Sequence, residues 1–298
     1  MAVEDDGTAR DDHTTETTPE MAPEEAFALV GHEMRFAILR ALWDAGEESL
    51  SFSELRTAVG NPDAGNFNYH LRKLLGPFVQ KLESEDGGYE LTVAAGYVMG
   101  AIESGGYHRS ESVGPVRVDA TCPECEGVVE AQYEDDKGRV ACVDCDHRMF
   151  NAPMPPGAVA PTDADGLAEL FNRWIRAVVR RVSAHICPVC AGRVNGRLVL
   201  DDENPVGEFR CEQCDRTVTA GIAAWLIEHP ALVQFSMNHE VDPRKAPLWS
   251  THWQQAVETV VVETEPPLAV VSITIDGDTL EIVVDDTMTV VETRRHWQ

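Results

Sequence analysis

The first third of the chain places apolar residues at helical spacing, with polar residues between them. The first such run begins at Pro23 and predicts one helix to about Ala45, where Gly46 ends it. Its apolar face contains Phe27, Val30, Met34, Ile38 and either Leu42 or Trp43. Before it, residues 1–22 are rich in Thr, Asp and Glu and show no periodicity, which is typical of a disordered acidic tail.

Two shorter helices follow, separated by a turn. Ser51 or Ser53 is expected to cap the first, and residues 60–62 (Gly-Asn-Pro) end it. The second helix, over residues 65–75, carries an apolar stripe of Phe67, Leu71 and Leu74. Its other faces hold Asn66, Asn68, Tyr69, Arg72 and Lys73. Such side chains can hydrogen-bond bases or neutralise phosphate, although amphipathic helices also carry a cation or two by chance.

A β-hairpin is predicted after these helices. Residues 78–83 and 89–93 are strand-like, and a Glu-Asp-Gly-Gly turn at 85–88 separates them. Residues 96–102 are expected to begin a further helix, followed by a Gly-rich linker and a new domain from about Val116.

The C-terminal half mixes strands and helices. A stiff Pro-rich linker at 154–161 precedes an amphipathic helix at 164–184. One stripe of this helix contains Leu167, Leu170, Phe171, Trp174 and Val178, and the opposite stripe contains Glu169, Arg173, Arg176 and Arg180. We expect the arginine stripe to be solvated or paired with carboxylates of this protein, rather than bound to phosphate or to an acidic partner.

The last 80 residues predict two helices and an antiparallel sheet. The helices span 220–228 and 231–238, broken by Pro230, and their core is expected to contain Trp225, Leu226, Phe235, Trp249 and Trp253. Strands are expected at 257–264, 269–276, 279–285 and 287–292. The hairpin turn is Asp276-Gly277, and Val271, Ile273 and Ile275 alternate on one face.

Eight cysteines form two matched sets. Each set has two CxxC pairs, separated by 16 residues in the first and by 20 in the second, and no cysteine is left over. The sets are Cys122, Cys125, Cys142, Cys145 and Cys187, Cys190, Cys211, Cys214. Strand-like runs at 127–133 and 197–200 lie between the pairs, so the pattern predicts two four-cysteine zinc ribbons, each holding one structural Zn²⁺.

Other uses of these cysteines are weaker hypotheses. Disulfides are disfavoured because the chain lacks a secretory signal, and redox chemistry would need a single CxxC in a βαβ setting. A shell of four thiolates leaves no position open for a catalytic water, so the zinc is expected to be structural. His147 and His185 lie beside the sets and are interpreted as bystanders.

The composition indicates an acidic protein without a membrane span. Acids outnumber bases 51 to 24 over 298 residues, and only four residues are lysine, a combination that resembles proteins of halophilic archaea. Net charge of −27 usually argues against nucleic-acid binding. In molar salt, however, counterion release contributes little, so hydrogen bonds, stacking and shape must carry binding. No apolar run approaches ~20 residues, and the N-terminus lacks signal-peptide features, so a cytoplasmic protein is expected.

The N-terminal segments together resemble a known regulator family. GHEMRFAILRAL (31–42), SFSELRTAVG (51–60), NFNYHLRKL (66–74) and GGYELT (87–92) resemble the ArsR-like winged helix-turn-helix regulators of haloarchaeal type. The resemblance implies that Asn66, Asn68, Tyr69 and Arg72 face DNA, that His70 and Lys73 lie near its backbone, and that Lys81, Gly87 and Gly88 belong to the wing. A half-buried, structural imidazole is an equally open reading of His70. All eight cysteines lie downstream, so the thiolate sensing sites of some family members are not carried over.

These observations predict an α+β multidomain regulator. The expected parts are a tail at 1–22, a winged helix at 23–103, zinc ribbons at 116–152 and 185–219, a connecting helix at 164–184, and a helical and antiparallel β module at 220–298. By arrangement alone, the C-terminal half resembles domains joined to winged helices in haloarchaeal regulators.

The expected function is transcription regulation as a homodimer on double-stranded DNA, with the C-terminal module serving oligomerisation, effector sensing or contact with the transcription machinery. The alternative is a general factor similar to the archaeal initiation factor that joins a winged helix to a zinc ribbon and contacts RNA polymerase. No paired nucleophile and base, phosphate-binding glycine loop or open metal site is found, so an enzyme is not expected.

Overall fold

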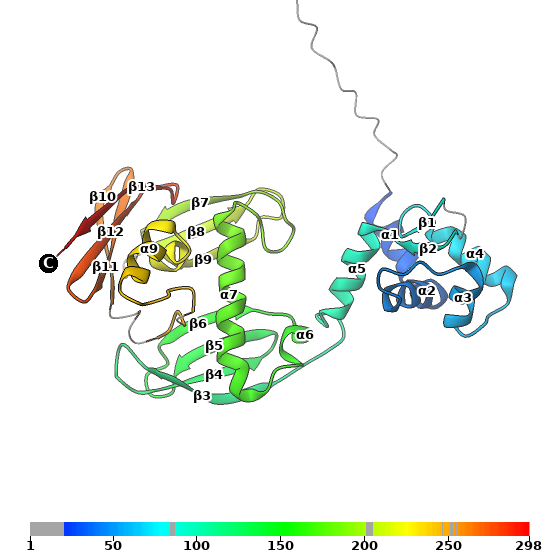
Figure 1. Cartoon of the computed structure of the whole chain (residues 1–298), viewed down its shortest axis with the longest axis horizontal. Helices are drawn as coiled ribbons and strands as arrows, with labels where there is room; N and C mark the ends of the chain where they lie inside the picture. Colours follow the sequence, from blue (N-terminus) through cyan, green and yellow to red (C-terminus); the bar gives the residue numbers. More distant parts are fainter. Residues whose placement is uncertain are drawn as a thin grey trace, which may run out of the picture. The chain divides into compact units, whose positions relative to one another are not determined.

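The chain folds into two compact units, and the boundary between them in the sequence falls between Glu103 and Ser104. The structure is a computed structural model, and it describes residues 21–83, 87–200, 205–245, 247–250, 253 and 256–297 (Figure 1). The N-terminal unit is helical with a β-hairpin, and the C-terminal unit contains both four-cysteine clusters and three antiparallel sheets. The predicted α+β class is therefore confirmed.

Five helices and a two-stranded hairpin make up the described N-terminal unit. The helices are α1 Pro23–Val30, α2 Glu33–Asp44, α3 Phe52–Ala58, α4 Ala64–Leu74 and α5 Val93–Glu103, and the strands are β1 Val79–Lys81 and β2 Tyr89–Leu91. The hairpin is antiparallel, with Val79 opposite Leu91. Its predicted turn lies mostly at 84–86, outside the described residues.

The local sequence explains where α3 and α4 begin and which way α4 faces. Ser51 caps α3 in a capping box with Glu54, which resolves the choice between Ser51 and Ser53. Asp63 caps α4 by accepting a hydrogen bond from the Asn66 amide at 2.9 Å. The predicted stripe of α4 is buried: Phe67, Leu71 and Leu74 are at most 1% exposed.

The single helix predicted from Pro23 to Ala45 is wrong, because the chain forms α1 and α2 instead. His32 is extended between them (φ −101°, ψ 129°), and its imidazole accepts a hydrogen bond from the Met34 amide at 3.2 Å. The apolar spacing continues across this break, so spacing alone could not locate it. One consequence is that Phe27 is 77% exposed, whereas Ile38 is buried.

A second correction concerns the residues after β2. Thr92 and Val93 were expected to end the second strand, but Val93 opens α5. The Thr92 hydroxyl accepts a hydrogen bond from the Ala95 amide at 3.2 Å and so caps the helix.

Three antiparallel sheets form the described C-terminal unit. The first is β3 Val113–Thr121, β4 Val128–Glu134, β5 Lys137–Cys142 and β6 Arg148–Pro153; the second is β7 Val194–Val199, β8 Val206–Cys211 and β9 Thr217–Gly221; the third is β10 Val257–Thr264, β11 Pro267–Ile275, β12 Asp278–Val284 and β13 Val290–His296. In each sheet the strands lie side by side in chain order.

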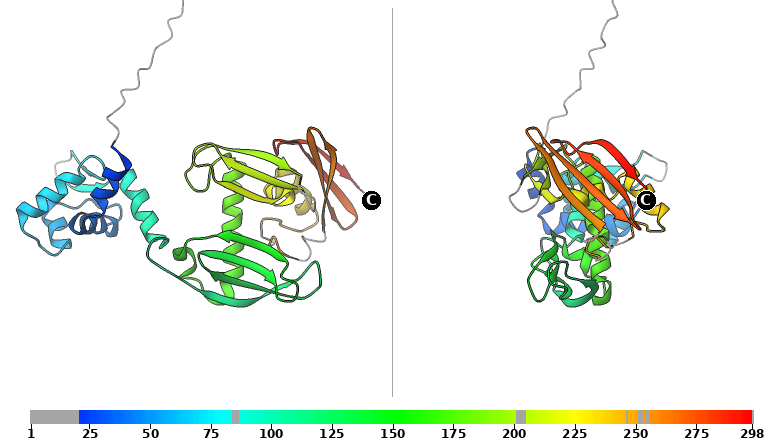
Figure 2. Two further views of the ribbon diagram at one scale, coloured as in Figure 1. Left: turned by 180° about the vertical axis from the view of Figure 1, so that it is seen from behind. Right: turned by 90° about the vertical axis from the view of Figure 1, so that its left-hand side faces the viewer.

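One long helix, α7 (Leu167–Ser183), connects the first two sheets. Leu167 and Phe171 pack into the core of the first sheet, and Val179 and Val182 pack into that of the second. Figures 1 and 2 show α7 running along both sheets. The shorter helices of this unit are α6 Pro156–Val159, the 3₁₀ turn η1 Ala164–Gly166, α8 Ile222–Leu226 and α9 Pro230–Asn238.

The segment predicted as a stiff linker at 154–161 belongs to the first core instead. Met154, Pro156 and Val159 are buried, and the Tyr133 hydroxyl donates a hydrogen bond to the Met154 carbonyl at 2.8 Å. The prolines here start the short helix α6 rather than stiffen a spacer.

The tryptophans expected in one C-terminal core divide between two. Trp225 and Trp253 pack, together with Leu226 and Phe235, in a core that the second and third sheets share. Trp249 packs instead in the core of the first sheet, with its ring centroid 5.9 Å from that of Phe150. The chain therefore returns to the first sheet after completing the second.

The C-terminal sheet follows the prediction except at its last strand. Asp276 and Gly277 have positive φ and form the β11–β12 turn, and the inward side chains of β11 are buried. The last strand is β13, rather than 287–292, because residues 285–289 form a loop held by the Asp285 carboxylate. The Asp286 carbonyl in this loop accepts a hydrogen bond from the Leu198 amide of β7 at 2.8 Å.

Candidate metal centres and exposed face of α4

Each predicted set of four cysteines is gathered into one cluster. Within each cluster all four Sγ atoms lie within 4.8 Å of one another, and all eight cysteines are free. The Sγ atoms are 3.6 Å apart in the Cys122–Cys145 pair and 3.5 Å apart in the Cys125–Cys142 pair. Sulfurs about 2.3 Å from a tetrahedral ion lie about 3.8 Å from one another. The Sγ–Sγ distances in this cluster therefore fit four thiolates bound to one tetrahedral metal ion.

The second cluster has the same geometry. The Cys187 and Cys214 sulfurs are 3.7 Å apart, and those of Cys190 and Cys211 are 3.5 Å apart. Both clusters consist of four cysteines and include neither His147 nor His185. The His185 Nδ1 atom lies 3.0 Å from the Val194 carbonyl instead.

One backbone turn, used four times, places the sulfurs. In each turn the amide of the first cysteine donates to the carbonyl five residues later, at 2.8–3.1 Å. The residue before that carbonyl has φ near +60° in every case, and these residues are Glu126, Asp146, Ala191 and Asp215. Because the backbone makes the turn, the sulfur positions do not depend on those side chains. At Gly127 in the first turn, a Cβ would lie 2.2 Å from the Asp144 carboxylate, so a larger residue there would displace that side chain.

The crowding of thiols makes each cluster a site for a cation. The backbone amide of Cys145 lowers the pKa of Cys142 to about 7, and that of Cys214 does the same for Cys211. The Gly127 amide favours a thiolate at Cys125, but the neighbouring cysteine side chains outweigh it and raise the pKa of Cys125 to about 12. Four adjacent thiolates therefore need a positive ion to offset their repulsion.

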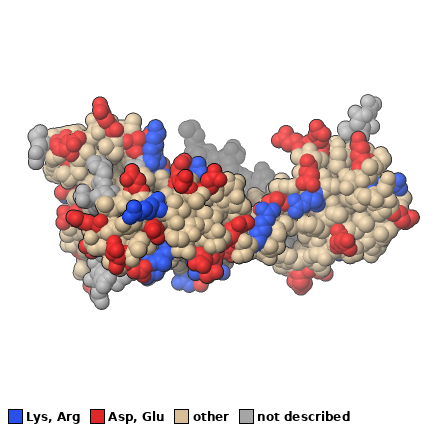
Figure 3. All heavy atoms as spheres, turned by 90° about the horizontal axis from the view of Figure 1, so that it is seen from below, with Lys and Arg blue, Asp and Glu red and all other residues tan. Residues whose placement is uncertain are grey.

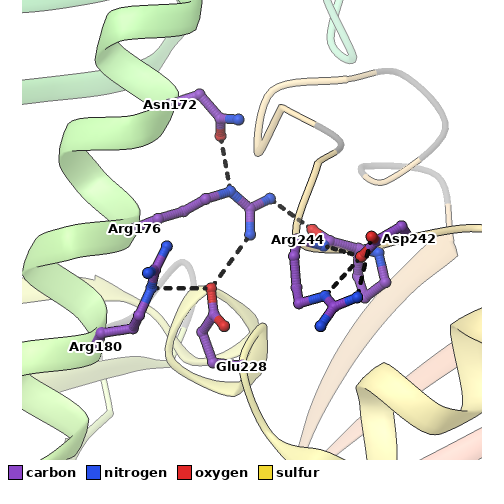
Figure 4. Close-up of polar contacts among 7 residues, drawn as sticks. Asn172, Arg176, Arg180, Glu228, Asp242 and Arg244 are labelled. Carbon is purple, nitrogen blue, oxygen red and sulfur yellow. Dashed lines mark hydrogen bonds and ion pairs between the residues drawn. The ribbon is translucent and has the colours of Figure 1, made fainter.

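Helix α7, which lies between the two cysteine sets in the sequence, carries a buried arginine, Arg176. The sequence analysis placed this residue in the polar stripe of the helix. Arg176 is 2% exposed. Its guanidinium donates to the Asn172 side chain at 3.2 Å and to the Pro243 carbonyl at 2.6 Å, and it lies 3.6 Å from the Glu228 carboxylate (Figure 4). Arg180 also pairs with Glu228, at 3.5 Å. The predicted pairing with the protein's own carboxylates thus occurs, but one arginine is buried rather than solvated.

The outward face of α4 is polar and accessible. Asn66, Arg72 and Lys73 are exposed, Tyr69 is 57% exposed, and Asn68 is half-buried. The Lys73 ammonium lies 5.8 Å from the centre of the Tyr69 ring, a cation–π geometry. Among the described residues, no carboxylate forms an ion pair with Arg72 or Lys73.

The remaining predicted contacts have different environments. His70 is 6% exposed, and its ring centroid lies 4.2 Å from that of His32. Burial, then His32 and Arg35, lowers the pKa of His70, so the structural reading of this residue is favoured over a phosphate contact. Lys81 is exposed on β1, and Gly87 is half-buried.

Gly88 is a packing position rather than an exposed wing residue. It is buried, and a Cβ at this position would lie 2.6 Å from the Ser49 hydroxyl. The glycine at position 88 is visible in the sequence, but its close contact with Ser49 is visible only in the structure.

Comparison with known proteins gives two family matches. Residues 119–290 match the family described as domain of unknown function DUF7351, which covers more than half of the chain. The chain belongs to the DUF7351 family. Residues 23–102 match a second family, domain of unknown function DUF7347. The DUF7351 match includes both cysteine clusters and α7, and the DUF7347 match includes α4 and the hairpin.

No curated protein and no solved structure matches the DUF7351 chain. None of its described helices is long and apolar enough to cross a membrane.

Proposed function

We propose that this protein is a DNA-binding transcriptional regulator in which α4 is the recognition helix of a winged helix. The observation that carries the proposal is the division of α4 into two faces. Phe67, Leu71 and Leu74 fix it to the core, while Asn66 and Tyr69 offer exposed groups suited to base edges. Among the described residues the two cations of this face, Arg72 and Lys73, have no carboxylate partner and so remain available to phosphate.

Local charge supports the same role. Acidic side chains are scattered over the visible surface of both units, with fewer basic ones among them (Figure 3). Residues 61–82 differ, with one acid, Asp63, against Arg72, Lys73 and Lys81. A locally basic segment in a chain of net charge −27 can approach phosphate where the rest of the surface repels it.

We propose two structural Zn²⁺ ions in the clusters. The first would be held by Cys122, Cys125, Cys142 and Cys145, and the second by Cys187, Cys190, Cys211 and Cys214. Zinc prefers four thiolates in a tetrahedron, and such a shell leaves no position for water or substrate. The ions would stabilise the ribbons, and the proposed role is binding rather than catalysis.

A homodimer is the proposed DNA-binding form. Phe27 on α1 and Val93 and Tyr97 on α5 are each at least 77% exposed, which is unusual for large apolar side chains and favours contact with a second copy. A dimer would place two recognition helices about 34 Å apart along one face of the duplex.

Promoter occupancy across the genome tests the proposal. A regulator is expected at a limited set of promoters, and a general factor at nearly all of them. In DNase footprints of an occupied promoter, Tyr69→Ala and Arg72→Ala should each weaken binding by ~1–3 kcal/mol. Lys137→Ala, an exposed cation on β5, is the matched control and should leave the footprint unchanged. Unchanged footprints for Tyr69→Ala and Arg72→Ala would remove α4 from the interface.

A further inference from the structure

The two cysteine clusters differ in exposure, although their backbone turns are the same. Each cluster has two buried cysteines, but the other two are exposed in the first cluster and half-buried in the second. The half-buried pair, Cys190 and Cys214, packs against the core that the second and third sheets share. The exposed pair of the first cluster is Cys125 and Cys145. A chelating molecule therefore reaches two sulfurs of the first cluster more easily than any sulfur of the second.

A carboxylate lies beside one of the exposed sulfurs of the first cluster. A Cβ at Gly127 would lie 2.2 Å from an Asp144 carboxylate oxygen and 3.1 Å from the Cys125 Sγ atom, so these two groups are neighbours. The same carboxylate oxygen accepts a hydrogen bond from the Val128 amide at 3.2 Å, which holds it in this position. Four thiolates around one Zn²⁺ leave a net negative charge, which a neighbouring carboxylate repels. Asp144 therefore disfavours the metal-bound state of the first cluster.

The equivalent position of the second cluster holds a neutral side chain. Gln213, like Asp144, is the residue before the last cysteine of its set. A Cβ at Gly192 would lie 2.8 Å from the Gln213 Oε1 atom and 3.2 Å from the Cys190 Sγ atom. The Gln213 amide thus occupies the place that the carboxylate occupies in the first cluster. The two centres differ there by one negative charge.

An arginine from outside the ribbon supports the second cluster. Arg181, in the last turn of α7, donates to the Cys187 carbonyl at 3.0 Å and to the Pro188 carbonyl at 3.3 Å. The guanidinium ties this cysteine turn to α7 and brings a positive charge close to the thiolates. Contacts of this kind behind the metal ligands orient them, and their loss typically lowers metal affinity about 10–100-fold. Arg181 therefore favours the metal-bound state of the second cluster.

We propose that the first cluster is an exchangeable zinc site and the second a retained one, so that zinc supply decides the folded state of the first ribbon alone. Cys122 and Cys142 belong to the core of the first sheet, together with Trp249. Cys187 and Cys211 belong to the core that the second and third sheets share. Loss of the first ion therefore loosens β4–β6 and leaves β7–β9 in place. The inference rests on the two zinc ions proposed above and does not depend on DNA binding by α4.

The rate of zinc release tests this inference in the full-length protein. Elemental analysis first confirms two zinc ions per chain, and an excess of the neutral chelator TPEN then captures the ions as they leave. A neutral chelator is used because a charged one would itself be attracted or repelled by the side chains under test. We expect two phases of equal amplitude, with rates that differ at least tenfold. After the fast phase, amide hydrogen exchange should show lost protection in β4–β6 and unchanged protection in β7–β9.

Reciprocal substitutions assign each phase to a cluster. Asp144→Asn keeps an oxygen acceptor for the Val128 amide but removes the charge, so it should slow the fast phase about threefold or more and leave the slow phase unchanged. Gln213→Glu should accelerate the slow phase and leave the fast phase unchanged. Arg181→Gln should accelerate the slow phase about tenfold or more. Arg173→Gln, at an exposed position of the same helix, is the matched control and should change neither phase.

The possible failures of the inference and of the metal assignment are distinguishable. Two bound ions that leave at one rate would overturn the inference, as would a slow phase that responds to Asp144→Asn or a fast phase that responds to Gln213→Glu. Lost protection in β7–β9 before β4–β6 would also overturn it. Fewer than two zinc ions in the loaded protein would instead overturn the proposed metal centres, and this inference with them.

Discussion

Replacing Arg176 with methionine should destabilise the C-terminal unit far more than replacing an arginine elsewhere on α7. Methionine keeps the apolar stem but removes the hydrogen bonds to Asn172 and the Pro243 carbonyl, and the 3.6 Å ion pair with Glu228. Hydrogen bonds to a charged group contribute about 1.5–3 kcal/mol each, and breaking a buried pair costs about 3–5 kcal/mol. The Glu228 side chain is 23% exposed and retains Arg180, so we expect the lower end, about 3 kcal/mol.

Thermal unfolding of the metal-loaded protein measures this effect. For a domain of about 150–250 residues, 1 kcal/mol shifts Tm by about 2–4 °C, so Arg176→Met should lower the Tm of this unit by about 6–12 °C. Arg173→Met is the control, because Arg173 is 63% exposed and its pair with Glu169 is worth at most about 0.5 kcal/mol. Adding Glu228→Gln to Arg176→Met should recover part of the loss, because it removes a half-buried carboxylate that has lost one of its two arginine partners. A Tm for Arg176→Met equal to that of the control would refute the buried network as a source of stability.

Three further predictions concern the metal centres, pH and the first core. Elemental analysis should find two zinc ions per chain, and Cys125→Ser or Cys190→Ser should each remove one; a stoichiometry unaffected by either change would contradict the assignment. The lowered pKa of His70 means that the unfolded chain binds its proton more readily, so stability at α4 is present above the ordinary pKa near 6.5 and falls as pH drops through it. The protection factors of the α4 amides, which correct for the intrinsic pH dependence of exchange, should therefore fall between pH 7.5 and 5.5, and fall less in His70→Leu; an equal fall in both proteins would exclude His70 as the cause. Trp249→Ala should cost about 3–5 kcal/mol and broaden NMR signals of the first sheet rather than the second, and the reverse pattern would contradict its placement.

The periodicity of apolar residues and the spacing of short motifs predicted the parts of the fold that depend on residues close in sequence. The buried stripe of α4, a serine cap for α3, the Asp276-Gly277 turn and the grouping of the cysteines all follow from residues close in sequence, although only the structure decides for Ser51 over Ser53. Each of these features depends on a local backbone conformation or a short fixed spacing. Local sequence therefore predicts them well.

Features set by distant contacts were not predictable in the same way. Trp249 packs on a sheet that ends almost a hundred residues earlier, and Gly88 is required by Ser49. Arg176 has the spacing of a surface residue, and only the distant Glu228 and Pro243 make its burial possible. The break at His32 was missed because both flanking helices pack on the same core and keep the apolar spacing.

The most direct measurement is selection of binding sequences from a random duplex library by the zinc-loaded, full-length protein in molar KCl. The proposed recognition role of α4 predicts one enriched motif with two related half-sites, which a Tyr69→Ala and Arg72→Ala double variant no longer enriches. Lys137→Ala should enrich the same motif as the unmodified protein. Absence of an enriched motif, or the same motif from the α4 double variant, would contradict the role of this helix.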